Sequence, residues 1–226
     1  MISYYDDVAA TFTNFAMSGI DKVHFGLEAA VSIPIYHTLA LNGAVSWGQY
    51  TYDSNPYYLQ TQDNSGDIVS DGYVYWKDFR VESTPQTAVN VGLSWRSNNN
   101  IYLSADFNYY NNMYLSMSPI YRTDAVITGG MAPGDIEHLR RQEKFDSAYT
   151  LNASIGKNWY IHRKYTLGFS LDVKNILNNQ DIKTGGYEQT RLSKNTETTV
   201  TTYQAFDSKY FYMFGTTYYL NLYFRF

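Results

Sequence analysis

Two segments of the sequence combine residue types that could hold a phosphate or a metal ion. Residues 128–135, TGGMAPGD, have the glycine spacing of a phosphate-binding loop. However, Asp135 and Ile136 stand where that loop needs Lys and Ser or Thr, so no cation would reach a phosphate. Residues 63–67, DNSGD, have the composition of a calcium loop but lack its ordered ligand spacing and its closing Glu. We therefore expect both segments to be turns in loops, with calcium binding at residues 63–67 as the weaker alternative.

No other residues are spaced for catalysis or for a metal ion. The four histidines have no second ligand three or four residues away. They are His24, His37, His138 and His162. The sequence contains no cysteine, which excludes disulfides and thiolate metal sites. No Ser/His/Asp set or carboxylate pair stands in a context that favours catalysis, so we expect no enzyme activity, no metal and no cofactor.

Aromatic side chains gather in two long segments that lie between expected strands. Their rings could stack on a sugar or grip a peptide or a chelate. The candidates for ligand contact are Tyr57, Tyr58, Tyr73, Tyr75, Trp76, Tyr203, Phe206 and Tyr210. The alternative is that these rings form an aromatic girdle or pack the loops together. The sequence does not separate carbohydrate, peptide, vitamin and siderophore ligands.

Seven segments of the sequence alternate apolar and polar residues with a period of two, which is typical of β-strands with one apolar face. They cover residues 24–35, 39–51, 88–96, 101–110, 148–160, 165–175 and 213–226. The charged residues of these segments fall almost entirely on the polar faces. They are Glu28, Arg96, Asp106, Asp172, Lys174 and Arg225. The exception is Lys157, whose stem can reach lipid headgroups because it lies beside Trp159 near a strand end.

This charge pattern favours strands of a transmembrane β-barrel with a wet lumen. A charge on the lipid-facing side would cost on the order of 2 to 4 kcal/mol at the membrane midplane. The 24 tyrosines are suited to the membrane interface, where the ring can lie at headgroup depth and the hydroxyl stays hydrated. We therefore expect an all-β fold, an antiparallel transmembrane barrel segment.

The connections between the expected strands alternate between short and long. Residues 36–38, 97–100 and 161–164 are short turns, whereas residues 52–87, 112–147 and 177–211 are long. Short turns on one side and long loops on the other are typical of outer-membrane barrels, and a periplasmic carboxyl terminus would place the long loops outside the cell. Three structureless connections of this length would be uncommon in a soluble β-sandwich or lectin.

The sequence contains no apolar run that approaches the roughly 20 residues of a spanning helix, so a membrane-spanning chain would cross with strands. Residues 1–10, MISYYDDVAA, lack the basic and apolar regions of a secretory signal. A secreted barrel that begins in this way would be a fragment of a longer protein.

Four blocks of the sequence carry a family resemblance. They are residues 4–34 (YYDDVAATFTNFAMSGIDKVHFGLEAAVSIP), 81–95 (VESTPQTAVNVGLSW), 151–191 (LNASIGKNWYIHRKYTLGFSLDVKNILNNQDIKTGGYEQTR) and 218–226 (YYLNLYFRF). Together they resemble the carboxyl-terminal barrel portion of TonB-dependent outer-membrane receptors. In that family a strand that ends like residues 171–180, LDVKNILNNQ, is followed by an external loop and a terminal strand that ends in Phe.

The resemblance implies a Gram-negative outer-membrane receptor that imports scarce or bulky nutrients through a barrel of about 22 strands. Residues 1–226 would be its carboxyl-terminal portion, with seven strands and no plug domain, and would not transport alone. Implied partners are outer-membrane lipid, the barrel-assembly machinery, the rest of the barrel and plug, TonB through the plug, and a surface lipoprotein, but no nucleic acid. The implied assembly signal is Tyr218, Leu220, Leu222, Phe224 and Phe226.

Two binding modules of a different class are the alternatives. One is a small outer-membrane barrel closed on itself, which would need an eighth strand within residues 9–15. The other is a soluble β-lectin-like module.

Overall fold

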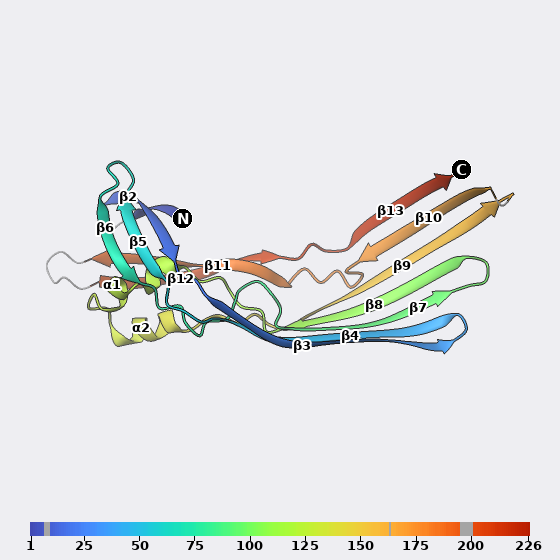
Figure 1. Ribbon diagram of the computed structural model, residues 1–226, viewed down its shortest axis with the longest axis horizontal. Helices are drawn as coiled ribbons and strands as arrows, with labels where there is room; N and C mark the ends of the chain where they lie inside the picture. Colours follow the sequence, from blue (N-terminus) through green and yellow to red (C-terminus); the bar gives the residue numbers. More distant parts are fainter. Residues whose placement is uncertain (7–9, 163, 195–200) are drawn as a thin grey trace.

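The computed structural model describes residues 1–6, 10–162, 164–194 and 201–226, with the side chains of residues 192–194 and 201–203 outside that description. Seven long strands form one antiparallel sheet at one end of the elongated molecule, and shorter elements gather at the other end (Figure 1). We call these two ends the long sheet and the outer part. The long sheet contains β3 (Lys22–Tyr36), β4 (Leu39–Tyr52), β7 (Thr87–Arg96), β8 (Ile101–Asn111), β9 (Ala148–Ile161), β10 (Tyr165–Lys174) and β13 (Thr217–Arg225).

The strand order of the long sheet is β13-β10-β9-β8-β7-β4-β3, so every strand pairs with its neighbours along the chain among these seven. The seven predicted strands, the short turns at residues 36–38 and 97–100 and the antiparallel all-β fold are thereby confirmed. Of the third predicted turn, residues 161–164, residue 163 lies outside the described residues. The turn after β7 is closed by a hydrogen bond from Ser97 N to Ile101 O (2.8 Å), with Asn100 in the left-handed region at φ 58°. The last strand begins at Thr217, four residues later than predicted.

One face of the long sheet is apolar across all of its strands. Residues directly opposite each other in a ladder point to the same face. Leu103 pairs with Ile155, Ile155 with Leu171, and Leu171 with Leu220. Leu103 is 41% exposed and Leu220 is 59% exposed. The apolar face is therefore open along its length, as a surface that meets lipid would be.

The opposite face of the long sheet carries polar side chains that are bonded across the strands. Asn42 Nδ2 donates to Ser94 Oγ (3.2 Å), and the hydroxyls of Ser104 and Ser154 lie 2.8 Å apart. Asn90 Nδ2 likewise donates to Asn108 Oδ1 (2.9 Å). The charged residues that were predicted to lie on the polar face do lie there, because the strand pairing places them on the same side of the sheet as the hydrogen-bonded residues. These charges are Glu28, Arg96, Asp106, Asp172, Lys174 and Arg225.

Two glycines on the polar face make room for tyrosine rings of neighbouring strands. A Cβ on Gly156 would overlap the Tyr102 ring and lie 2.7 Å from Phe169 O, and one on Gly168 would overlap the Tyr223 ring. Covering a strand glycine with a cross-strand aromatic ring is a known way to stabilise a sheet. The rings of Tyr102 and Tyr223 therefore fix the register of β8–β9 and β10–β13.

We expect Gly156→Ala to destabilise the chain by about 1 to 3 kcal/mol, the usual cost of overpacking, because the backbone oxygen of Phe169 cannot swing away. Urea unfolding in detergent micelles, followed by circular dichroism, measures this effect. Gly43→Ala on β4 is the matched strand control, since a Cβ there meets only the Val31 side chain, at an ordinary 3.5 Å. An unchanged unfolding midpoint in Gly156→Ala would contradict the packing of Tyr102 on this glycine.

The outer part contains regular elements that the sequence did not predict. A four-stranded sheet has the order β1-β2-β5-β6, and β11 pairs with β12. Their bounds are β1 (Ile2–Asp6), β2 (Thr11–Ser18), β5 (Tyr57–Gln62), β6 (Ile68–Tyr73), β11 (Lys183–Lys194) and β12 (Thr201–Tyr212). Between β8 and β9 lie η1 (Pro119–Arg122), α1 (Asp124–Ile127) and α2 (Pro133–Arg140). The expectation of three structureless connections is therefore wrong, because short strands and short helices fill them.

The strand considered for a small closed barrel belongs to this outer sheet instead. β2 overlaps residues 9–15 and pairs with β1 and β5, so it adds no eighth strand to the long sheet. No closed barrel forms within the described residues, where β3 and β13 each pair on one side only. An open edge exposes unpaired backbone groups.

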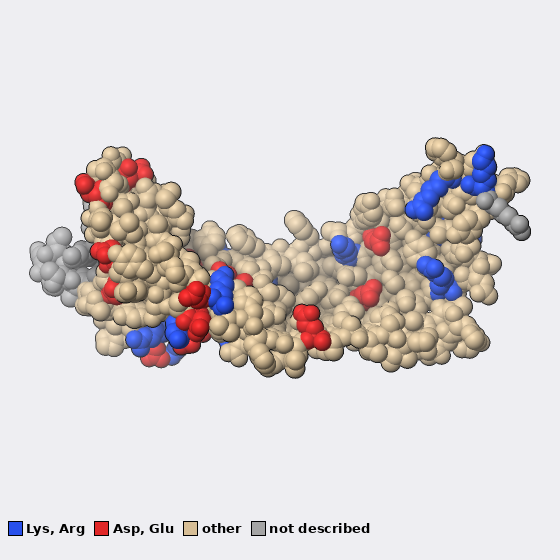
Figure 2. Space-filling model, in the orientation of Figure 1, with Lys and Arg blue, Asp and Glu red and all other residues tan. Residues whose placement is uncertain are grey.

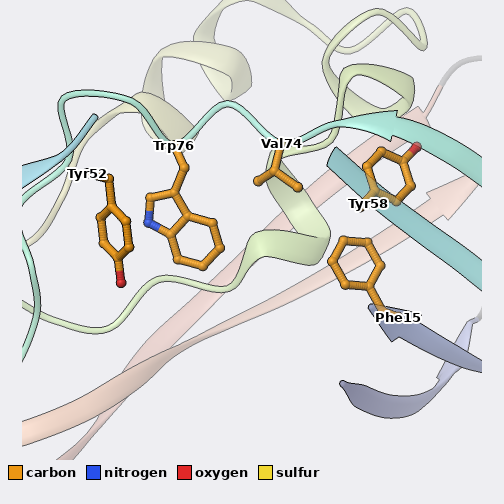
Figure 3. Close-up of a cluster of buried hydrophobic side chains, with 5 residues drawn as sticks. All are labelled: Phe15, Tyr52, Tyr58, Val74 and Trp76. Atoms are coloured by element: carbon orange, nitrogen blue, oxygen red, sulfur yellow. The ribbon is translucent and has the colours of Figure 1, made fainter. Parts of the chain in front are cut away.

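The hydrophobic core lies in the outer part. Figure 3 shows the ring of Phe15 facing that of Tyr58, with Trp76 beside Tyr52 and Val74 between the two pairs. The Phe15 and Tyr58 rings stack at 5.0 Å between centroids. A second cluster joins the segment after β8 to the start of β11. It contains Met113, Leu115, Phe145, Ala148 and Ile182.

The long sheet contributes little to either cluster. Among the described residues, the only buried apolar side chains that come from its strands are Tyr52 and Ala148, at the strand ends next to the outer part. No helix of the described chain is long and apolar enough to cross a membrane.

Candidate ligand-binding site

The predicted ligand-contact residues divide into packed and exposed groups. Tyr58 is 1% exposed and Trp76 is 7% exposed, because both belong to the core of the outer part. Tyr57 and Tyr73 lie opposite each other on β5 and β6, with ring centroids 5.8 Å apart, and both rings are exposed. Tyr58 and Trp76 therefore pack the loops together, which was the alternative to ligand contact. Tyr57 and Tyr73 remain at the surface.

Tyr75 is the predicted residue that lines a cavity. The cavity has a volume of about 470 Å³ and lies between residues 75–79 and the three short helices. Its lining is Asn55, Tyr75, Lys77, Asp78, Phe79, Arg122, Ile127, Leu139 and Arg140. Cavities of this size are typical of small-molecule sites. We call it the outer cavity.

Backbone and side-chain hydrogen bonds hold the segment that forms one side of the outer cavity. Tyr75 N donates to Arg122 O (2.8 Å), and Asp78 N donates to Tyr52 O (2.8 Å). Asn55 Oδ1 accepts from the backbone N–H groups of Trp76 and Lys77, each at 2.9 Å. The outer cavity is thus preformed by contacts within the protein.

A buried ion pair joins three elements beneath the outer cavity. Arg122 forms a two-bond ion pair with Glu188 of β11, and its side chain is only 3% exposed. The same guanidinium donates to Leu139 O and Ser118 O, each at 2.9 Å. Arg122 therefore links the end of η1, the end of α2 and the β11–β12 hairpin.

The other predicted candidates lie on β12. Tyr210 OH donates to Glu143 Oε1 (2.7 Å), and the Lys183 ammonium lies 3.6 Å from the centre of the Tyr210 ring. The hydrogen bond to Glu143 raises the pKa of the Tyr210 hydroxyl. Phe206 is exposed, and the side chain of Tyr203 lies outside the described residues. Tyr210 thus ties the hairpin to the segment before β9 and lies away from the outer cavity.

Burial alone would lower the pKa of Lys183, but Tyr210 and Glu143 raise it above its ordinary value. Lys183 Nζ lies 3.5 Å from Glu143 Oε1, so lysine, tyrosine and glutamate form one polar cluster.

The segment with the composition of a calcium loop, residues 63–67, connects β5 to β6, as expected. Of the segment with the glycine spacing of a phosphate loop, residues 128–132 connect α1 to α2, but residues 133–135 begin α2, so the expectation of a loop turn holds only for its first five residues. Within the described part of the chain, no group of three or more His, Asp and Glu side chains could hold a metal ion.

The predicted assembly-signal residues lie on or next to β13 at one edge of the long sheet. Tyr218, Leu220, Leu222 and Phe224 pair with alternate residues of β10, so they share the apolar face, and Phe226 follows the strand. The start of β13 is held by Asn175, which is buried. Its Nδ2 donates to Asn179 O (2.9 Å) and Phe214 O (3.1 Å).

Charged side chains differ between the two ends of the molecule. On the face shown in Figure 2, Lys and Arg gather at the tip of the long sheet, whereas Asp and Glu are frequent over the outer part. Lys157 lies over the Trp159 ring at 5.2 Å, and Lys164 lies over the Tyr165 ring at 5.3 Å. Basic side chains that lie along aromatic rings at a strand end are suited to a membrane interface.

No protein-family model matches the chain, and no curated protein matches it. Any function must therefore be argued from the sheet, the outer cavity and the sequence resemblance.

Proposed function

We propose that this chain is part of a transmembrane β-barrel in a Gram-negative outer membrane. The single observation that carries the proposal is the long sheet, with its open apolar face on one side and its hydrogen-bonded polar face on the other. A soluble sheet would cover an apolar face of this extent. A barrel strand needs about 9 to 11 residues to cross the membrane, and strands β3 to β10 of the sheet satisfy this length.

The open edges of the sheet support a larger barrel. Because β3 and β13 each lack one partner among the described strands, further strands would close the wall. From the sequence resemblance to TonB-dependent receptors, we propose that the complete protein is a barrel of about 22 strands with a plug. In that receptor the outer part would face the outside of the cell and bind a scarce or bulky nutrient, which is imported with energy from TonB.

The proposed partners follow from this placement. Lipid would contact the apolar face, the barrel-assembly machinery would recognise β13, and the remaining barrel strands would pair with the two open edges. A surface lipoprotein could contact the outer part from outside. The chain would contribute wall and ligand contacts, and import would need the rest of the receptor.

Site-directed labelling tests the membrane placement, since the chain has no native cysteine. In outer-membrane vesicles, we expect Val91→Cys on the apolar face to react with a lipid-soluble maleimide and to resist a charged one. Asp67→Cys, in the exposed turn between β5 and β6, is the control and should react with the charged reagent. Equal reaction of Val91→Cys and Asp67→Cys with the charged maleimide would overturn the proposal.

A further inference from the structure

The outer cavity combines apolar walls with one unpaired charge of each sign. Tyr75, Phe79, Ile127 and Leu139 supply the apolar and aromatic surface. The other charges of the lining already have partners: Arg122 pairs with Glu188, and Lys77 lies 3.7 Å from Asp53. Asp78 and Arg140 form no ion pair with the described residues, although both line the cavity.

A ligand that matches this lining has an apolar body and carries both an amine and a carboxylate. Asp78 could accept hydrogen bonds from an ammonium group, and the planar Arg140 guanidinium is suited to bidentate contact with a carboxylate. A neutral sugar matches the lining less well, because it could stack on Tyr75 and Phe79 but carries no charge to pair with Asp78 or Arg140. The volume of about 470 Å³ has room for a short peptide.

We propose that the outer cavity binds short zwitterionic peptides with apolar side chains, with the amine at Asp78 and the carboxylate at Arg140. This inference rests on the proposed uptake function and names the substrate class for it. Asp78 has φ 72°, in the left-handed region that Asp and Asn adopt more readily than most residues.

The test measures binding of radiolabelled leucyl-leucine to outer-membrane vesicles that carry the full chain. We expect N-acetylation of the peptide, or amidation of its carboxylate, to weaken binding about tenfold each, since each removes a charge-assisted hydrogen bond. Maltose serves as the saccharide probe and should not compete. Equal binding of the free and acetylated peptides, competition by maltose alone, or no peptide binding would overturn the proposal.

Substitutions assign each end of the peptide to its partner. Asp78→Asn should weaken the free peptide about tenfold and abolish the effect of acetylation, and Arg140→Gln should abolish the effect of amidation. Asn also tolerates the left-handed backbone, so Asp78→Asn preserves the loop. The controls are Arg141→Gln, next to Arg140 but paired with Glu137 on the surface, and Asp67→Asn in the distant turn.

Two readouts separate this inference from the proposed function. If Val91→Cys is labelled from lipid but no peptide binds, only the peptide inference fails. If Val91→Cys is open to the charged maleimide, the membrane placement fails whatever the peptide does.

Discussion

Replacing Arg122 by Met is expected to destabilise the outer part by about 3 to 5 kcal/mol, the usual cost of leaving one member of a buried ion pair without its partner. Glu188 would stay largely buried with its charge uncompensated, and Leu139 O and Ser118 O would lose their donor. Thermal unfolding in micelles, followed by near-ultraviolet circular dichroism, measures the loss of packing around Trp76 and its neighbours.

The paired change Arg122→Met with Glu188→Leu should recover part of that stability, because it removes both charges together. Arg141→Gln is the matched surface control. Its ion pair with Glu137 is exposed, and such pairs contribute about 0 to 1 kcal/mol. If Arg122→Met and Arg141→Gln shifted the unfolding temperature equally, the buried pair would not have the role described.

The second large effect is expected for Val91→Arg. Val91 lies on the apolar face in the middle of β7, opposite Phe107 on β8, so an arginine there would meet hydrocarbon. In the proposed barrel, we expect a cost of about 2 to 4 kcal/mol and a lower yield of the chain in the outer membrane, measured by membrane fractionation and immunoblotting.

The control for Val91→Arg is Asn90→Arg, one residue earlier on the polar face, where the new charge can be hydrated. Its yield should fall much less. Similar losses for both variants would mean that the two faces of the long sheet do not meet different surroundings.

The long sheet could be predicted from the sequence because apolar and polar residues alternate along its strands, with Lys157 as the charged exception on the apolar face. Residues such as Leu103 and Ser104 alternate on β8, and the same pattern recurs on each of its strands. The outer strands have no such signal. Tyr57 and Tyr58 are adjacent and alike, yet one is exposed and the other buried, so residue type does not reveal the face.

The outer cavity could be predicted only in part. The aromatic content of the first long connection pointed to Tyr75, but Asp78 and Arg140 line the same cavity only because the fold brings distant segments together. The same holds for Arg122 and Glu188, which are 66 residues apart. Asn175 falls within residues 171–180, which carry part of the sequence resemblance, and the structure adds its bonds to the segment before β13.

In the proposed membrane barrel, the location of the buried clusters would make the two ends of the molecule depend on different solvents. The outer part excludes water by its own packing, whereas the long sheet has no interior and would owe its order to surrounding acyl chains. Removing detergent should therefore unfold the long sheet before the outer part, and heating should unfold the chain in two separable steps. Such a division would let loops diverge to suit new nutrients without disturbing the membrane wall.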